Sequence, residues 1–477
     1  MKKNIKILIM SCAGLLILGA TLLVLYLTRE VDQPPEPPPP PDNTTVALTE
    51  MSADDILFIH INNHNETSGY SIAQNPEEPG DFIIPDFILR HPSSPVPYNL
   101  QEIARVAGIA AAITAQDTIE ENAENLSQYG LTSPRGQVDV VFNDGTSFGF
   151  FIGNATPLGS SVYIKPFHSD TVYIVHENIT TPFLRERHQW VLRQAFPYYD
   201  SNETPRIDRV TIHRIDLGEP MVIEAMPIPP LEEVRTFNTH RLISPLNVEI
   251  DQEKGMRVLF GIFGLIASEV VLIAPDEAEL EYYGFNNPAS VISIEFGDEV
   301  YTLTIGTYRQ TADGVNLGWY GMSSHVPEVL FLFTPESMPW IYVQQQDIIA
   351  EMFLTPYIHS LERVEITAGD ISLNVTVADE VEDFRDLYMF LISAKGEELF
   401  LEDLPHDSQL IARITYVYKD RDSGSETVEF YTAEGESLRS IIRLNGENVF
   451  KTRIMYTTRL LENIQAYIDG GSINYDW

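Results

Sequence analysis

The sequence predicts an α+β protein, built as a tandem repeat of mixed helix and antiparallel-sheet units behind one N-terminal transmembrane helix. The first observation is a stretch at 129–134, Tyr-Gly-Leu-Thr-Ser-Pro, that returns as Tyr-Gly-Phe-Asn-Asn-Pro at 283–288. The offset is 154 residues, and an apolar helical pattern precedes each copy while two strand patterns follow it. The second observation is a long apolar run near the N-terminus. Internal repetition indicates a chain assembled from copies of one structural unit.

The repeated stretch has the composition of a structural turn. Its glycines adopt positive φ at little cost, which suits the end of a short helix, and its prolines fix an extended entry into the next strand. A helix-to-strand connector without chemistry is the main interpretation. The residues of this predicted turn are Tyr129, Gly130, Pro134, Tyr283, Gly284 and Pro288.

Offsets of 153 and 154 residues recur elsewhere and define the predicted domains. Ile152-Gly153 returns as Ile305-Gly306, and Asp55-Ile56 corresponds to Arg209-Val210 and again to Arg363-Val364. The third copy lacks the Tyr-Gly-x-x-x-Pro stretch and is interpreted as truncated. We therefore predict an anchor at 1–29, a stalk at 30–47 and repeat units at 48–203, 204–357 and 358–477.

The predicted anchor is an apolar run of 21 residues from Ile7 to Leu27. That length spans a hydrocarbon core of about 30 Å. Three lysines precede the run and acidic residues follow it, which places the N-terminus in the cytoplasm and the bulk of the chain outside the cell membrane. A cleaved signal peptide and a lipoprotein modified at Cys12 are the alternatives, and both fit less well.

Residues 31–41 contain seven prolines in eleven positions, which predicts a stiff polyproline II stalk. Beyond residue 29 the chain holds 26 basic and 69 acidic residues, a formal charge of −43. Such a charge argues against nucleic acid as a partner. No cysteine occurs there, so neither disulfides nor thiolate chemistry is expected.

In the first unit we expect a strand at 56–61, a short apolar run at 82–84 and a small-residue helix at 99–115 beginning at Asn99. A short acidic helix is predicted at 117–128. The Asn-Asp-Gly-Thr sequence at 143–146 predicts a hairpin between strands 138–142 and 147–152. A further strand pair, 162–165 and 171–175, precedes a helix around 180–194.

The second unit repeats this order, with a helix at 256–267, strands at 291–296, 300–305 and 329–333, and a helix around 335–350. The third unit has strands at 364–366 and 371–377, and a helix near 382–394. It then has a hairpin of 411–418 with 427–431, a strand at 449–454 and a terminal helix at 457–467.

The order helix, Tyr-Gly-Leu-x-x-Pro, strand, Asp-Gly turn, strand, Ile-Gly-x-x-Thr-Pro and Val-Tyr-x-Val resembles the bacterial family called domain of unknown function 4340. The residues that carry the resemblance lie at 129–134, 144–145, 152–157 and 172–175. It implies a membrane-attached extracytoplasmic protein, in some relatives linked to ABC transporters of the gliding type. It supplies no catalytic residues, metal ligands or cofactor.

Several clusters were weighed as functional sites against a structural role. His60 and His64 share a strand face but have no identifiable third metal ligand. The acidic stretch 420–426 resembles a calcium loop, yet its spacing fits a hairpin turn better. Trp319 and Tyr320, in an expected loop, are the candidate sugar-stacking pair, with packing between strands as the alternative.

The candidate partner surface is the densest basic cluster outside the anchor, which comprises Arg185, Arg187, His188 and Arg193. A solvated helix face is the alternative interpretation of this cluster. Common hydrolase, nucleotide and zinc-protease motifs do not occur in the sequence. We therefore expect a binding or structural protein, an accessory part of a membrane transporter or envelope assembly, without a cofactor. A carbohydrate-active envelope hydrolase is the alternative.

Overall fold

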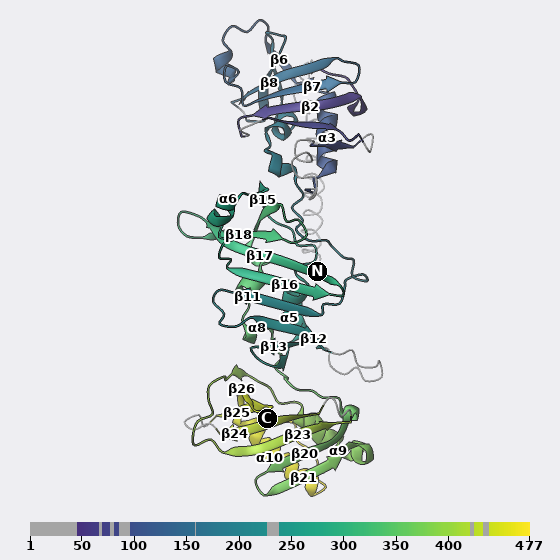
Figure 1. Ribbon diagram of the computed structural model, residues 1–477, viewed down its shortest axis with the longest axis vertical. Coiled ribbons are helices and arrows are strands. Elements are labelled where there is room, and N and C mark those ends of the chain that lie inside the picture. The colour runs from purple at the N-terminus through teal and green to yellow at the C-terminus, as the bar shows by residue number, and fades with distance from the viewer. Residues whose placement is uncertain are drawn as a thin grey trace, which may run out of the picture. The chain divides into compact units, whose positions relative to one another are not determined.

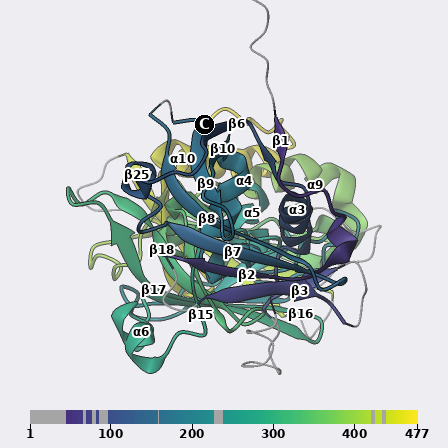
Figure 2. The same ribbon diagram turned by 90° about the horizontal axis from the view of Figure 1, so that it is seen from above.

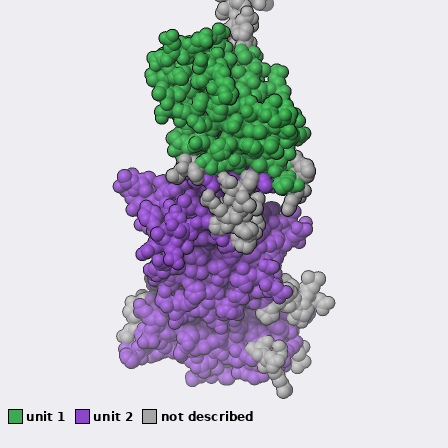
Figure 3. Space-filling model, turned by 45° about the horizontal axis from the view of Figure 1, so that its top comes forward, with its two compact units in different colours: residues 1–82, 104–185 green, residues 83–103, 186–477 purple. Residues whose placement is uncertain are grey.

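The computed structural model describes residues 45–65, 69–76, 81–84, 96–157, 159–226, 238–419, 424–432 and 438–477. The chain divides into two compact units, one of residues 1–82 and 104–185 and one of residues 83–103 and 186–477 (Figure 3). The predicted anchor and all of the stalk up to residue 44 lie outside the described part. Within that part, no helix combines the length and the apolar character needed to cross a membrane.

In the described part of the chain, three large sheets and one small sheet make up the strand structure, and the strand pairings within them are antiparallel (Figures 1 and 2). The small sheet pairs β1 (Val46–Ala47) with β5 (Thr114–Ala115). Together with the helices, these sheets confirm the predicted α+β class.

The first sheet has eight strands in the order β4-β3-β2-β7-β8-β9-β10-β6. Their bounds are β2 Ile56–Asn63, β3 Tyr70–Gln74, β4 Phe82–Ile83, β6 Asp117–Glu120, β7 Gly136–Phe142, β8 Ser147–Ala155, β9 Ser161–Pro166 and β10 Val172–His176. In β7 every second residue is buried, because successive side chains of a strand point to opposite faces. The predicted hairpin at 143–146 is confirmed, with Gly145 at φ 85° and Phe142 donating to Thr146 over 2.9 Å.

The second sheet has nine strands in the order β14-β13-β12-β11-β16-β17-β18-β19-β15. Their bounds are β11 Arg209–Arg214, β12 Met221–Ala225, β13 His240–Ser244, β14 Val248–Glu249, β15 Glu269–Ile273, β16 Ser290–Phe296, β17 Glu299–Gln310, β18 Asn316–Ser323 and β19 Val329–Phe333. Part of its core is aromatic: Phe263 meets Phe296 edge-on, and Phe196 stacks on Tyr301.

The third sheet has seven strands in the order β21-β20-β23-β24-β25-β26-β22. Their bounds are β20 Leu361–Ala368, β21 Ile371–Thr376, β22 Glu398–Leu399, β23 Leu410–Tyr418, β24 Ser425–Thr432, β25 Arg439–Leu444 and β26 Glu447–Arg453. Helices α9 (Val377–Leu391) and α10 (Ile454–Ile468) contact each other and this sheet. The rings of Phe390 and Tyr456, both buried, stack between them at 5.1 Å.

The remaining helices are α3 Leu100–Ala111, α4 Glu177–Thr180, α5 Gln252–Phe260, α6 Glu277–Tyr282, α7 Pro339–Tyr342 and α8 Gln345–Ile348. Asn99 begins α3 as predicted, since its Oδ1 accepts from the backbone of Glu102. Helix α5 begins earlier than predicted, because Asp251 accepts from the amide of Lys254, and it ends at Phe260 with Gly261 as its C-cap.

Three predicted helices are wrong. Residues 117–128 form strand β6 and part of the 3-10 helix Leu126–Tyr129, because β6 pairs with β10 at the sheet edge. The segment around 180–194 breaks into α4 and two 3-10 helices, Thr181–Leu184 and Arg187–Trp190. The segment 335–350 breaks likewise, since Pro335 and Pro339 are each the first residue of a separate short helix.

Candidate functional site

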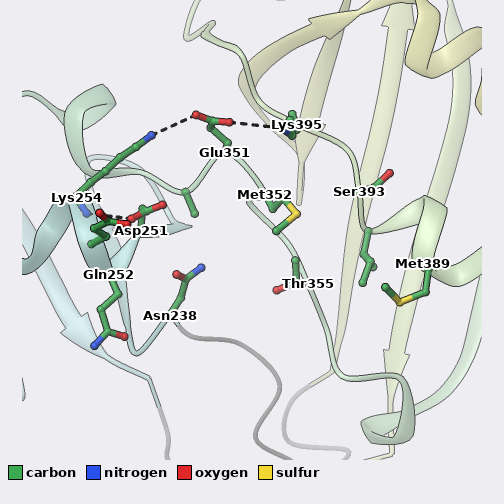
Figure 4. Close-up of a pocket in the computed structure, with 13 residues that line it drawn as sticks. Asn238, Asp251, Gln252, Lys254, Glu351, Met352, Thr355, Met389, Ser393 and Lys395 are labelled. Atoms are coloured by element: carbon green, nitrogen blue, oxygen red, sulfur yellow. Dashed lines mark hydrogen bonds and ion pairs between the residues drawn. The ribbon is translucent and has the colours of Figure 1, made fainter. Parts of the chain in front are cut away.

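The second unit contains a cavity of about 780 Å³ beside the connection between the second and third sheets, which we call the methionine groove. One wall comes from the start of α5, the other from the end of α9, and the connecting segment 350–355 runs between them (Figure 4). The lining residues are Asn238, Asp251, Gln252, Glu253, Lys254, Ala350, Glu351, Met352, Thr355, Met389, Ile392, Ser393 and Lys395.

Two methionines supply much of the apolar surface of the groove. Met352 is 48% exposed and Met389 is 49% exposed, although both belong to segments that pack against well-buried neighbours. A second cavity of about 510 Å³ shares Thr355, Met389 and Ile392 with the groove, so the apolar surface continues along α9. Methionine is flexible and polarizable, and exposed methionines are a feature of surfaces that adapt to a bound partner.

Charges of both signs surround this apolar surface. Glu351 accepts from Lys254 at 3.4 Å and lies 3.9 Å from Lys395, so one carboxylate links the two walls (Figure 4). All three side chains are between 41% and 57% exposed. Such exposed pairs contribute at most about 1 kcal/mol each to stability, which leaves them able to exchange partners when a ligand arrives.

A backbone frame holds the connecting segment in place. Ala350 donates to the carbonyl of Glu249 at 3.0 Å, and Gly396 donates to the carbonyl of Glu351 at 2.8 Å. Asp251 donates its amide to Ile348. The groove is therefore built by main-chain contacts from both sheets, while its lining side chains stay accessible.

The two predicted turns have closely similar geometry. Gly130 has φ 69° and Gly284 has φ 85°. Tyr129 packs on Tyr163 with ring centroids 4.9 Å apart, and Tyr283 packs on Tyr320 at 4.5 Å. Pro134 and Pro288 each lead into the next strand, β7 or β16.

Each turn also rests against a glycine of the second strand that follows it. A Cβ added to Gly153 would lie 2.2 Å from the carbonyl oxygen of Tyr129, and one added to Gly306 would lie 2.1 Å from that of Tyr283. Only glycine allows so close an approach of two backbones.

The basic cluster does not form one helix face. Arg185 belongs to the first unit, and the other three residues belong to the second. His188 lies 3.6 Å from Glu186, and Arg193 donates to the carbonyl of Ser268 at 3.0 Å. The segment is not one helix but two short 3-10 helices, so the alternative of a helix face is wrong, and the role of these residues as a partner surface stays a prediction.

The other candidates also serve structure. His60 contacts the hydroxyl of Ser71 at 3.2 Å, and His64 contacts the carbonyl of Arg135 at 2.7 Å. No group of three metal-ligating side chains occurs in the described part of the chain. Most of the acidic stretch 420–426 lies outside that part.

The side chains of the predicted aromatic pair, Trp319 and Tyr320, point to opposite faces of the sheet and cannot stack on one ligand together. The reason is that the two residues are neighbours on β18. Trp319 packs on Tyr308 at 5.0 Å and donates to Tyr342 at 2.7 Å, whereas Tyr320 is buried. The expected loop is thus a strand, and Trp319, half-buried, forms an aromatic group with the exposed Tyr308 and Tyr342.

Sequence reasoning missed the methionine groove. Its residues come from four places in the sequence, residue 238 and the stretches 251–254, 350–355 and 389–395, and no short motif joins them. The only local signal was Asp251 followed by Lys254, a helix start that carries no functional meaning by itself.

Comparison with known families gives one match. Residues 92–238 match the family model described as Domain of unknown function (DUF4340). The match confirms the resemblance inferred from the turn and hairpin residues. No curated protein matches the chain.

Proposed function

We propose that this protein, a member of the DUF4340 family by its residues 92–238, is a single-pass membrane-anchored, extracytoplasmic binding protein. The observation that carries the proposal is the methionine groove, with its half-exposed methionines and its exchangeable ion pairs. Apolar surface framed by a few charged groups is typical of sites that bind a partner.

The anchor and stalk support the location. A 21-residue apolar run preceded by lysines has the length and charge asymmetry of a transmembrane helix whose N-terminus is cytoplasmic. The proline-rich segment after it reaches about 3.1 Å per residue and would hold the folded units away from the bilayer.

The repeat is part of the same proposal. The two turns share a glycine with positive φ and a close backbone approach, at Gly153 in one and Gly306 in the other. Two copies of one unit are expected to share such features. We take the third sheet as a third, diverged copy. Tandem units present several surfaces along one chain, which suits an accessory role in a membrane assembly such as an ABC transporter.

Removing residues 1–29 is expected to abolish function in cells while the remaining chain stays folded. The measurement is complementation of a strain that lacks the gene, with folding of the truncated protein followed by circular dichroism. Fusion to an unrelated single-pass anchor is the matched control and should restore function. Full complementation by the truncated, unanchored chain would contradict the proposal.

A carbohydrate-active hydrolase is the second candidate, favoured by the aromatic group of Tyr308, Trp319 and Tyr342, in which both tyrosines are exposed. Aromatic rings stack on sugars. Release of fragments from cell-wall polymers by the full chain would support it, and loss of that release in Trp319→Ala would locate the site.

A further inference from the structure

We propose that Glu249, Arg241 and Glu426 form a pH-responsive contact between the second and third sheets, the carboxylate contact, which sets the width of the methionine groove. This deepens the proposed function because it concerns the same groove. The experiment that tests the carboxylate contact needs no ligand. Its result can therefore contradict the contact without contradicting the binding role, and the reverse.

The contact joins two sheets through partly buried side chains. Arg241 of β13 donates from Nη2 to Oε1 of Glu426 of β24 at 3.1 Å, and their side chains are 23% and 17% exposed. Tyr418 of β23 donates its hydroxyl to Oε2 of Glu426 at 2.5 Å. Glu249, at the end of β14, is 7% exposed and accepts from Asn238 at 3.0 Å.

Glu249 is connected to the groove in two ways. Its side chain is held by Asn238, and its backbone carbonyl accepts from Ala350; both of these partners line the groove. Any displacement of Glu249 therefore moves one wall and the start of the connecting segment. The third sheet is tied to the second by the ion pair of Glu426 with Arg241.

The charges in the contact do not balance. Two carboxylates lie near one guanidinium, that of Arg241: Glu426 accepts a hydrogen bond from it, and Glu249 is its cross-strand neighbour. Nε of Arg241 is buried without a hydrogen-bond partner in the described structure. Burial raises the pKa of Glu249; Asn238 and Arg241 oppose this rise, and Glu426 adds to it. When Glu249 is ionised, the contact holds one uncompensated negative charge.

The direction of the pH effect follows. A carboxyl whose pKa is higher in the folded chain than in the unfolded chain stabilises the fold below its ordinary pKa, and this stabilisation is lost as the pH rises through the folded value. The carboxylate contact is thus tightest when Glu249 is protonated. Raising the pH loosens the contact and widens the groove.

The test measures the groove width directly. Spin labels are placed at Gln252 and Ser393, on opposite walls, in the full chain with Cys12 replaced by serine, and their separation is measured between about pH 4 and pH 8. We expect the separation to increase with pH, on the order of 2 Å or more. Glu249→Gln should abolish the increase, since glutamine still accepts from Asn238 but cannot ionise.

Two further variants separate this mechanism from a merely structural role. Glu426→Gln should shift the midpoint of the change in spin-label separation to lower pH, because the neighbouring negative charge that raises the pKa of Glu249 is gone. Glu253→Gln, an exposed glutamate on the same wall, should leave the profile unchanged. A separation that does not depend on pH, or a profile that Glu249→Gln leaves intact, would overturn the proposal.

Discussion

Replacing Gly153 with alanine is expected to lower the free energy of unfolding of the first unit by about 3 kcal/mol. The added Cβ would lie 2.2 Å from the carbonyl oxygen of Tyr129, a backbone atom that cannot move without dislodging the turn. The loss should appear as faster hydrogen exchange in β7 and β8, measured by mass spectrometry of the full chain. All four tryptophans lie at or beyond residue 190, so their fluorescence does not report on this unit.

Gly108→Ala is the matched control. Gly108 is an exposed helical residue of α3 with no atom within 4 Å of an added Cβ, so alanine there should stabilise the chain by up to about 1 kcal/mol. Gly306→Ala should destabilise the second sheet as Gly153→Ala destabilises the first. Equal effects of Gly153→Ala and Gly108→Ala would show that the close approach at the turn is unimportant.

Replacing Arg214 with methionine is expected to destabilise the second unit by about 3 kcal/mol. The Arg214 side chain is 3% exposed, and its Nη1 donates to the carbonyls of Trp340 and Val343 at 3.3 and 2.7 Å. Methionine preserves most of the volume but leaves both carbonyls without this donor. Because Trp340 is buried beside the change, urea unfolding followed by tryptophan fluorescence measures the loss.

Arg209 offers a control on the same strand. It pairs with Glu224 at 2.9 Å, but its side chain is 41% exposed, so Arg209→Met should cost less than about 1 kcal/mol. The guanidinium of Arg214 also lowers the pKa of Asp216 by hydrogen bonding. If the two methionine variants unfold at the same urea concentration, the burial of Arg214 is not what stabilises the unit.

The parts of the fold that the sequence predicts are those set by neighbouring residues. The hairpin at 143–146 follows from its turn residues, and the strand pair β23–β24 follows from two β-branched and aromatic runs. The helix predicted at 117–128 was wrong because pairing with β10 decides the conformation of Asp117–Glu120. Local propensity is overridden when a sheet edge supplies a partner.

The candidate site was beyond sequence reasoning for a related reason. Glu249 and Glu426 lie on different sheets, and nothing in their flanking residues distinguishes them from the many other acidic residues of this chain. Only the folded backbone brings Arg241 between them. Likewise, Met352 and Met389 have no periodic or motif relationship, and their shared groove exists only because α9 packs beside the connecting segment.

Site-specific photo-crosslinking in cells tests whether the methionine groove receives a partner. A photoreactive residue is placed at Met389 of the full anchored chain, and in parallel at Met455, which is 58% exposed on α10 outside the groove. We expect one recurrent crosslinked membrane protein from position 389 and none from position 455. The same products from both positions, or none from position 389 while general crosslinking still recovers a partner, would contradict it.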